Sequence, residues 1–130
     1  MDIRDLSIGD WVLDGNDNPA QILAIENWSD GHSLNVRIKD VGIGVVVITR
    51  VRPIPITQAI LEKNGFKKNG EYDEWNIGTW RTPYLLGVSL ERPAITIKWN
   101  GSSVFIDQAK YIHQLQHALR LAGVVKEIEL

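Results

Sequence analysis

Two histidines four residues apart have the clearest potential for chemistry in this sequence. His113 and His117 belong to the run Asp107–Gly123, where helical spacing would place them about 40° apart around the axis. Such a pair can chelate a metal ion, and H-Q-L-Q-H is similar to the zinc-protease pattern H-E-x-x-H. Gln114 replaces the glutamate of that pattern, and an amide cannot act as general base on a metal-bound water. His113 and His117 are therefore weak metal candidates, and histidines that hydrogen-bond locally are expected instead.

A second chemical possibility is a carboxylate pair beside aromatic rings. Glu71, Asp73 and Glu74 precede Trp75 in the sequence. Paired carboxylates beside aromatic side chains can indicate sugar hydrolysis, in which one carboxyl is protonated and the other ionised. These acids fall at the start of a predicted hairpin strand, where acids usually form a solvated face, and a unit of about 75 residues has little room for a substrate cleft. We therefore predict no catalytic residue and no enzymatic activity.

The tryptophan content favours binding over catalysis. The 130-residue chain contains 5 tryptophans, and both Trp75 and Trp80 have polar, turn-rich neighbours. Amphipathic aromatic side chains that stay partly exposed favour contacts with partners. The alternative is that they cap small cores, and the sequence leaves both interpretations open. Together with the polar face of the predicted helix, they make up the predicted binding surface, which consists of Trp75, Trp80, His113, Gln116, His117 and Arg120.

Composition bounds the classes of protein that fit. The chain is 44% hydrophobic and 23% charged, typical of a soluble globular protein. It has no cysteine, which excludes disulfides, thiolate catalysis and cysteine-based metal sites. No apolar run reaches the length of a membrane span, and the first residues do not form a signal peptide. We therefore expect a cytoplasmic protein with no cofactor and no membrane partner.

Charge makes nucleic acid a possible partner, though a weaker prediction. The net charge is −2, with 8 acids and 5 bases in residues 1–54 and 8 acids and 9 bases in residues 55–130. Neither half is the basic body of a strong phosphate binder, but a local basic patch can still act. The candidates for such a patch are Arg37, Lys39, Arg50 and Arg52.

The elements that must position these residues divide at a proline-rich segment. Residues 1–54 contain four or five short apolar segments, separated by turn formers such as the run Asp14–Pro19. Many short strands in about fifty residues favour a small closed barrel, because closure removes exposed edges. The opening IGDWV is similar to the entry of SH3-like barrels. The prolines of Arg52–Thr57 then predict an extended connection to a second subdomain, residues 55–130.

Residues 55–130 combine strands and helices. Thr57 is expected to cap a helix over Gln58–Asn64, which Gly65 stops. A β-meander follows, and its two Asn-Gly pairs, at 69–70 and 100–101, predict type I′ hairpin turns. The second turn pairs Trp99 with Ser102, Ile97 with Val104 and Ile95 with Ile106, which places these isoleucines on a face suited to cover by a helix.

The covering helix is expected over Asp107–Gly123. Asp107 is the predicted N-cap and Gly123 the residue just past the end. The apolar stripe of this helix contains Tyr111, Ile112, Leu115, Ala118, Leu119 and Ala122. The tail 124–130 alternates enough to predict a last strand. The predicted class is α+β, with an N-terminal SH3-like barrel and an antiparallel meander packed against a C-terminal helix.

Two blocks of the chain resemble a known group of proteins. They are PIPIT…ILEKNGF over 53–66 and YIHQLQHAL over 111–119, and they occur together with the IGDWV opening. The chain resembles small, uncharacterised bacterial proteins associated with prophages and mobile elements. This resemblance implies a phage-derived cytoplasmic protein, and it carries no activity or site residues.

We therefore expect a non-enzymatic protein-binding or adaptor module, acting through a protein partner or self-association. The alternative is a nucleic-acid-binding accessory protein that uses the barrel surface. A metal-dependent hydrolase using His113 and His117 is the third and weakest hypothesis.

Overall fold

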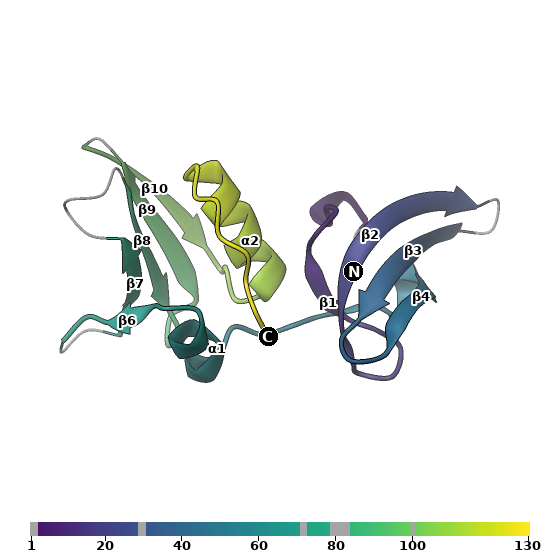
Figure 1. The fold of residues 1–130 in the computed structure, drawn as a ribbon. Coiled ribbons are helices and arrows are strands. Elements are labelled where there is room, and N and C mark those ends of the chain that lie inside the picture. The colour runs from purple at the N-terminus through teal and green to yellow at the C-terminus, as the bar shows by residue number, and fades with distance from the viewer. Residues whose placement is uncertain (1–2, 29–30, 71–72, 79–83, 100) are drawn as a thin grey trace. The chain divides into compact units, whose positions relative to one another are not determined.

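The computed structural model describes residues 3–28, 31–70, 73–78, 84–99 and 101–130 (Figure 1). The chain separates into two compact units, Met1–Ile54 and Pro55–Leu130. Each unit contains one five-stranded antiparallel sheet, and the main helix lies near the C-terminal end of the chain. This arrangement belongs to the α+β class, as the sequence predicts.

The first unit is an antiparallel sheet with strand order β4-β3-β2-β1-β5. Its elements are η1 (Ile3–Asp5), β1 (Trp11–Leu13), β2 (Pro19–Trp28), β3 (Gly31–Ile38), β4 (Gly42–Val47), η2 (Ile48–Arg50) and β5 (Arg52–Pro53). Within the described part of this unit, β4 pairs only with β3 and β5 only with β1. A hydrogen-bonded closed barrel is therefore not confirmed.

Alternation along the strands of the first unit creates its core. Val12, Ala20, Ile22, Leu34 and Val36 are fully buried, and Val46 and Val51 join them. Strand β4 ends at Val47, and the backbone amide of Val51 donates to the carbonyl of Ile48 at 3.2 Å, which closes a 3-10 turn. After this turn the chain no longer pairs with β3 and instead pairs, as β5, with β1.

The second unit pairs its strands in the order β10-β9-β8-β7-β6. Its elements are α1 (Gln58–Lys63), β6 (Lys67–Lys68), β7 (Trp75–Gly78), β8 (Tyr84–Ser89), β9 (Ala94–Trp99), β10 (Ser102–Asp107) and α2 (Ile112–Leu121). Helix α2 packs on β9, beside one face of this sheet (Figure 1). Ile95, Ile97, Leu86 and Val88 are buried together with Leu115 and Leu119 of the helix.

The two Asn-Gly pairs have different outcomes. The register predicted for the second hairpin is confirmed, because Ser102 pairs with Trp99, Val104 with Ile97 and Ile106 with Ile95. The prediction of a two-residue turn at Asn69-Gly70 is wrong. Lys68 pairs with Trp75, and the amide of Asn69 donates to the carbonyl of Glu74 at 2.8 Å, so a longer loop joins β6 and β7.

Helix α2 begins later than its sequence suggests. Asp107 is not its N-cap, because it still pairs with Ala94 as the last residue of β10. Tyr111 is the N-cap, held extended by a bridge to Pro55, and Gln114 Oε1 accepts its backbone N–H at 3.0 Å. The predicted stop is confirmed. Gly123 has φ +75°, and the Val124 N–H donates to the carbonyl of Leu119 at 2.9 Å, which is the hydrogen bond of a Schellman motif.

Helix α1 and the C-terminal tail are joined by Asn64. Thr57 Oγ1 caps α1 by accepting from the Ile60 amide, and Gly65 stops it, both as predicted. The predicted last strand is wrong, since residues 124–130 have no regular secondary structure. The tail instead runs along the buried amide of Asn64, whose Nδ2 donates to the carbonyl of Glu129 and whose Oδ1 accepts the Glu129 amide, at 2.8 and 2.7 Å.

Candidate binding surface at the edge of the first sheet

The two histidines of α2 form an aromatic row with Tyr111. His113 stacks on Tyr111 with a ring-centroid distance of 5.9 Å, and the His117 ring meets His113 edge-on at 5.8 Å. His113, predicted on the polar face, is buried. Among the described residues, no three histidine or acidic side chains are grouped so that they could hold a metal ion. The row therefore lends no geometric support to hydrolysis.

The predicted tryptophan surface is not assembled. Trp75 is only 5% exposed and pairs with Val88 inside the second sheet, so it caps a core. Trp80 lies outside the described residues. Of the helix residues, Gln116 and His117 are half-buried and Arg120 is exposed. Trp75 and the polar residues of α2 therefore do not share one accessible surface.

The acidic group before β7 also has structural roles. Asp73 Oδ2 accepts the backbone amides of Leu90 and Glu91, at 3.2 and 2.6 Å, and ties two loops together. The carboxylate of Glu74 lies directly over Gly87, where a Cβ atom would be 2.2 Å from Oε1. Glu71 falls outside the described residues. Asp73 and Glu74 are not among the residues that line the pocket described below.

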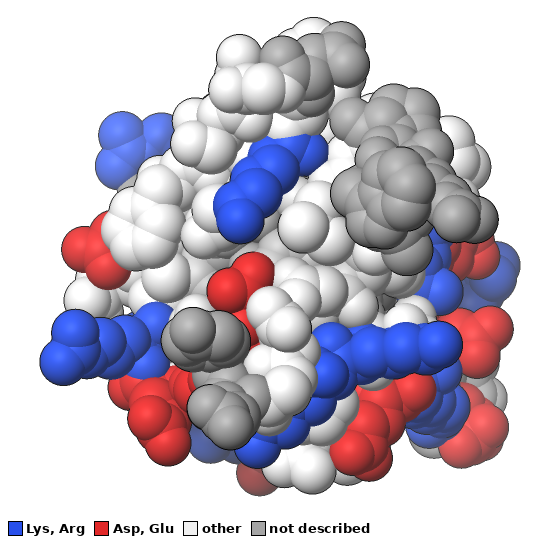
Figure 2. Space-filling model, turned by 90° about the vertical axis from the view of Figure 1, so that its left-hand side faces the viewer, with Lys and Arg blue, Asp and Glu red and all other residues white. Residues whose placement is uncertain are grey.

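The outer face of the second sheet presents charges of both signs. Figure 2 views this unit from the side opposite α2 and shows basic and acidic side chains among uncharged surface, most densely intermixed along the lower part. A strong phosphate-binding surface would need one predominant sign. This face therefore does not favour nucleic acid.

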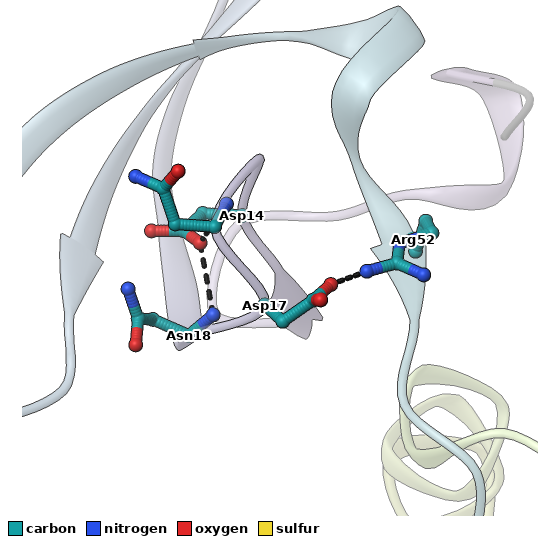
Figure 3. A network of polar contacts seen from close by, with 5 residues as sticks. Asp14, Asp17, Asn18 and Arg52 are labelled. Carbon is teal, nitrogen blue, oxygen red and sulfur yellow. Dashed lines mark hydrogen bonds and ion pairs between the residues drawn. The ribbon is translucent and has the colours of Figure 1, made fainter.

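The four basic candidates lie toward the end of the first sheet at which β2 begins. Arg52 forms an ion pair with Asp17 in the loop that Asp14 organises by accepting the Asn18 amide (Figure 3). The side chain of Arg50 lies beside Gly15 of the same loop. Arg37 and Lys39 are exposed at the C-terminal end of β3, where the Lys39 amide donates to the carbonyl of Pro19, the residue that follows this loop. Because Asp17 offsets the charge of Arg52, this end of the sheet does not present basic side chains alone.

The most exposed apolar surface of the first unit lies on β4. The side chains of Ile43, Val45 and Val47 are 76, 68 and 47% exposed. They project from the sheet face opposite the core, because their partners on β3 are Arg37, Asn35 and Ser33. We call these three residues the β4 stripe. Its signal in the sequence is a run with β-branched residues on both faces, which a buried strand would also show.

The backbone N–H and C=O groups of the β4 stripe face the free edge of the sheet. The amide of Lys39 donates to Pro19 of β2, and successive amides of a strand point in opposite directions. The amide of Ile38 therefore faces β4, so the pair of Ile38 and Gly42 is hydrogen-bonded. By the same alternation, Gly44 and Val46 bond to β3. The N–H and C=O groups of Ile43, Val45 and Val47 are then left on the edge, where they can pair with another strand.

A pocket of about 380 Å³ adjoins this edge. The residues that line it are Gly31, His32 and Ser33 of β3, Val45 and Val47 of β4, and Ile48 and Thr49 of η2. Nδ1 of His32 is buried, and none of the described residues makes a hydrogen bond to it. Sequence reasoning missed this site, because it needs the start of β3 and the end of β4 to lie side by side.

Comparisons with known proteins do not assign this surface. No protein-family model, no curated protein and no solved structure matches the chain. None of the helices in the described ranges combines the length and apolar character needed to cross a membrane. The function therefore has to be argued from the exposed edge and its pocket.

Proposed function

We propose that this protein is a non-enzymatic protein-binding module, and that its first unit binds an extended segment of a partner along β4. The observation that carries the proposal is the β4 stripe, in which exposed apolar side chains and unpaired edge groups come from the same residues. In strand addition, backbone hydrogen bonds supply affinity, and the side chains of alternate residues supply specificity. Ile43, Val45 and Val47 offer both kinds of contact on one strand.

The composition and length of the β4 edge support a role in binding. Natural edge strands are usually protected by charged side chains, proline or a covering segment. Residues 42–47 contain no charged residue and no proline, and the described elements add no strand beyond β4. The edge is 6 residues long, which is enough for a peptide to make several ladder bonds.

The remaining parts of the proposal concern fold family, origin and location. We propose that the first unit is related to SH3-like barrels, supported by a five-stranded order with a 3-10 turn before the last strand. The resemblance of residues 53–66 and 111–119 to prophage-associated proteins supports a phage-derived adaptor that acts in the cytoplasm.

The test is selection of short random peptides displayed on phage against the immobilised full chain. Enriched peptides are then measured against Val45→Pro and Val45→Ala. The Val45 amide faces the free edge, so proline there removes a donor for the partner without breaking a bond to β3. We expect Val45→Pro to weaken binding by about tenfold or more, the loss of roughly one hydrogen bond plus steric exclusion.

Val45→Ala is the matched control. It keeps the amide and removes only part of one apolar contact, so it should weaken binding clearly less than Val45→Pro does. Circular dichroism and unfolding curves establish that both variants fold. Equal binding of the enriched peptides to Val45→Pro and to the unsubstituted chain would contradict the proposal, as would a selection that enriches no peptide.

A further inference from the structure

The second sheet also ends in a strand with a free edge. Among the described strands, β10 pairs with β9 alone. Trp99 pairs with Ser102 across a two-residue connection, and in such a hairpin the flanking pair is hydrogen-bonded. By alternation, Val104 and Ile106 also bond to β9. The residues of β10 whose N–H and C=O groups face the free edge are then Ser103, Phe105 and Asp107.

The side chains of these three edge residues lie on the outer face of the second sheet, away from α2. Phe105 is 65% exposed, and Ser103 and Asp107 are exposed on either side of it. Lys98 of β9 pairs with Ser103, so this exposed lysine belongs to the same face. The edge therefore presents an apolar ring at its centre, a lysine beside one end and a carboxylate at the other.

Antiparallel pairing with β10 of a second copy matches this edge to itself. A two-fold axis at Phe105 places the two Phe105 rings opposite each other, a favourable cross-strand pair. The same axis places Ser103 of each copy opposite Asp107 of the other. All three edge residues then form hydrogen-bonded pairs, and no other symmetric register pairs all three.

The charges of the two copies are complementary in this register. Lys98 lies on one side of Ser103, and Asp107 of the second copy lies on the other side in the same row. The backbones of the two charged residues are two strand spacings apart, about 10 Å, so a lysine extended over the small serine reaches the carboxylate. Symmetry makes this contact twice. The two Asp107 residues stay roughly 14 Å apart, beyond the Debye length of about 8 Å.

The opposite face of β10 also gains contacts from this pairing. Val104 is 47% exposed and Ile106 half-buried, although their β9 partners Ile97 and Ile95 are buried. In the two-fold register Val104 of each copy lies opposite Ile106 of the other, as a closely spaced pair without hydrogen bonds between them. The second copy thus covers apolar side chains that α2 leaves accessible.

We infer that β10 is a self-association edge, through which two copies of the chain form a two-fold dimer. Phe105 lies at the axis, and an ion pair between Lys98 and Asp107 lies on each side. This inference does not require strand addition at β4, which belongs to the other unit. A ladder of 6 residues is smaller than the interfaces of stable complexes, which bury about 1,200 Å² or more. We therefore expect dimerisation to be weak and to depend on concentration.

The experiment is sedimentation velocity of the full chain at concentrations from about 5 to 500 µM, where we expect a monomer–dimer equilibrium. Phe105→Lys places two like charges at the axis and should abolish the dimer. Lys98→Glu makes both ion pairs repulsive and should weaken dimerisation by about tenfold. Lys67→Glu is the matched control, because it makes the same charge change on the same face at β6, the opposite edge. It should dimerise like the unsubstituted chain.

A mixture of two charge-reversed chains tests the register. Lys98→Glu and Asp107→Lys each repel their own copies, but a dimer of one with the other restores both ion pairs. We expect the mixture to dimerise about tenfold or more tightly than either variant alone. Circular dichroism and unfolding curves establish that the variants fold.

Absence of concentration-dependent association would overturn the inference. So would a mixture that restores no dimer, or equal weakening by Lys98→Glu and Lys67→Glu. Self-association that Val45→Pro abolishes and Phe105→Lys does not would assign it to β4 and refute pairing at β10. Species larger than dimers would mean open-ended pairing and refute the two-fold register. Peptide binding to Val45→Pro tests β4 separately, so either proposal can fail without the other.

Discussion

The contact between Asn64 and the C-terminal tail gives a prediction whose size follows from the structure. Asn64 is 3% exposed, and its amide makes three hydrogen bonds, to the carbonyls of Ile60 and Glu129 and to the Glu129 N–H, at 2.7 to 2.8 Å. A typical hydrogen bond contributes about 1 kcal/mol net, and a buried partner left without one costs about 1–3 kcal/mol. Asn64→Ala should therefore lower the free energy of unfolding of the second unit by about 3 kcal/mol.

Two further variants test the origin of this loss. Asn64→Asp keeps an acceptor for the Glu129 amide but replaces both donors, so a carboxylate would face the carbonyls of Ile60 and Glu129. We expect it to cost at least as much as alanine. Lys63→Ala removes a single exposed bond to Leu130 and should cost less than about 1 kcal/mol.

The assay is urea unfolding, followed by NMR signals from the second unit. A chain lacking residues 127–130 provides the critical comparison, because only the bond to Ile60 remains there for Asn64 to lose. In that chain Asn64→Ala should cost about 1 kcal/mol, and the difference measures the coupling between Asn64 and the tail. An equal cost with and without the tail would refute the reasoning.

Three more predictions follow from other contacts. Gly87→Ala should destabilise the second unit by about 1 kcal/mol, because the new Cβ displaces the Glu74 carboxylate and also lies 2.9 Å from Asn76 Oδ1. The added variant Glu74→Ala should recover part of that loss in the same unfolding assay, and the contact with Asn76 should keep the rest. Asp14→Ala removes the acceptor for the Asn16 and Asn18 amides, at 2.8 and 2.9 Å, and should cost the first unit about 1–2 kcal/mol by thermal unfolding, whereas no loss would deny Asp14 this role. In gel shifts with duplex DNA at varied salt we expect no salt-dependent complex, and a complex that Arg37→Glu weakens would favour the nucleic-acid alternative instead.

Local signals in the sequence predicted the parts of the fold that local chemistry decides. Gly65 and Gly123 end their helices because glycine adopts a positive φ at little cost, with values of +84° and +75°. Asn100-Gly101 sets the hairpin register because the short connection and the alternation of apolar residues agree. Thr57 caps α1 through its own hydroxyl.

Features that depend on contacts between distant residues were harder to predict. The start of α2 is set by the pairing of Asp107 with Ala94 and by the bridge of Tyr111 to Pro55. Local capping preferences predict neither of these contacts. The burial of Trp75 follows from its place opposite Val88 in the middle of a sheet. Its polar neighbours in the sequence suggested exposure because they lie on the loop that leads into the strand.

The candidate site depends most strongly on strand order. A run such as residues 42–47 has the same composition at the centre of a sheet as at its edge. Its function therefore depends on whether one side of the strand is left without a neighbouring strand. His32 and Thr49 likewise share a pocket only because β3 and β4 are antiparallel neighbours.

Amide hydrogen exchange along β4 tests the central claim most directly. Exchange rates are measured by NMR for the full chain, alone and saturated with an enriched peptide. Strand addition predicts an alternating pattern, in which the amides of Ile43, Val45 and Val47 slow by about tenfold or more while Gly44 and Val46, already bonded to β3, change little. Unchanged exchange at Ile43, Val45 and Val47 with the peptide bound, or protection confined to another strand, would contradict binding at this edge.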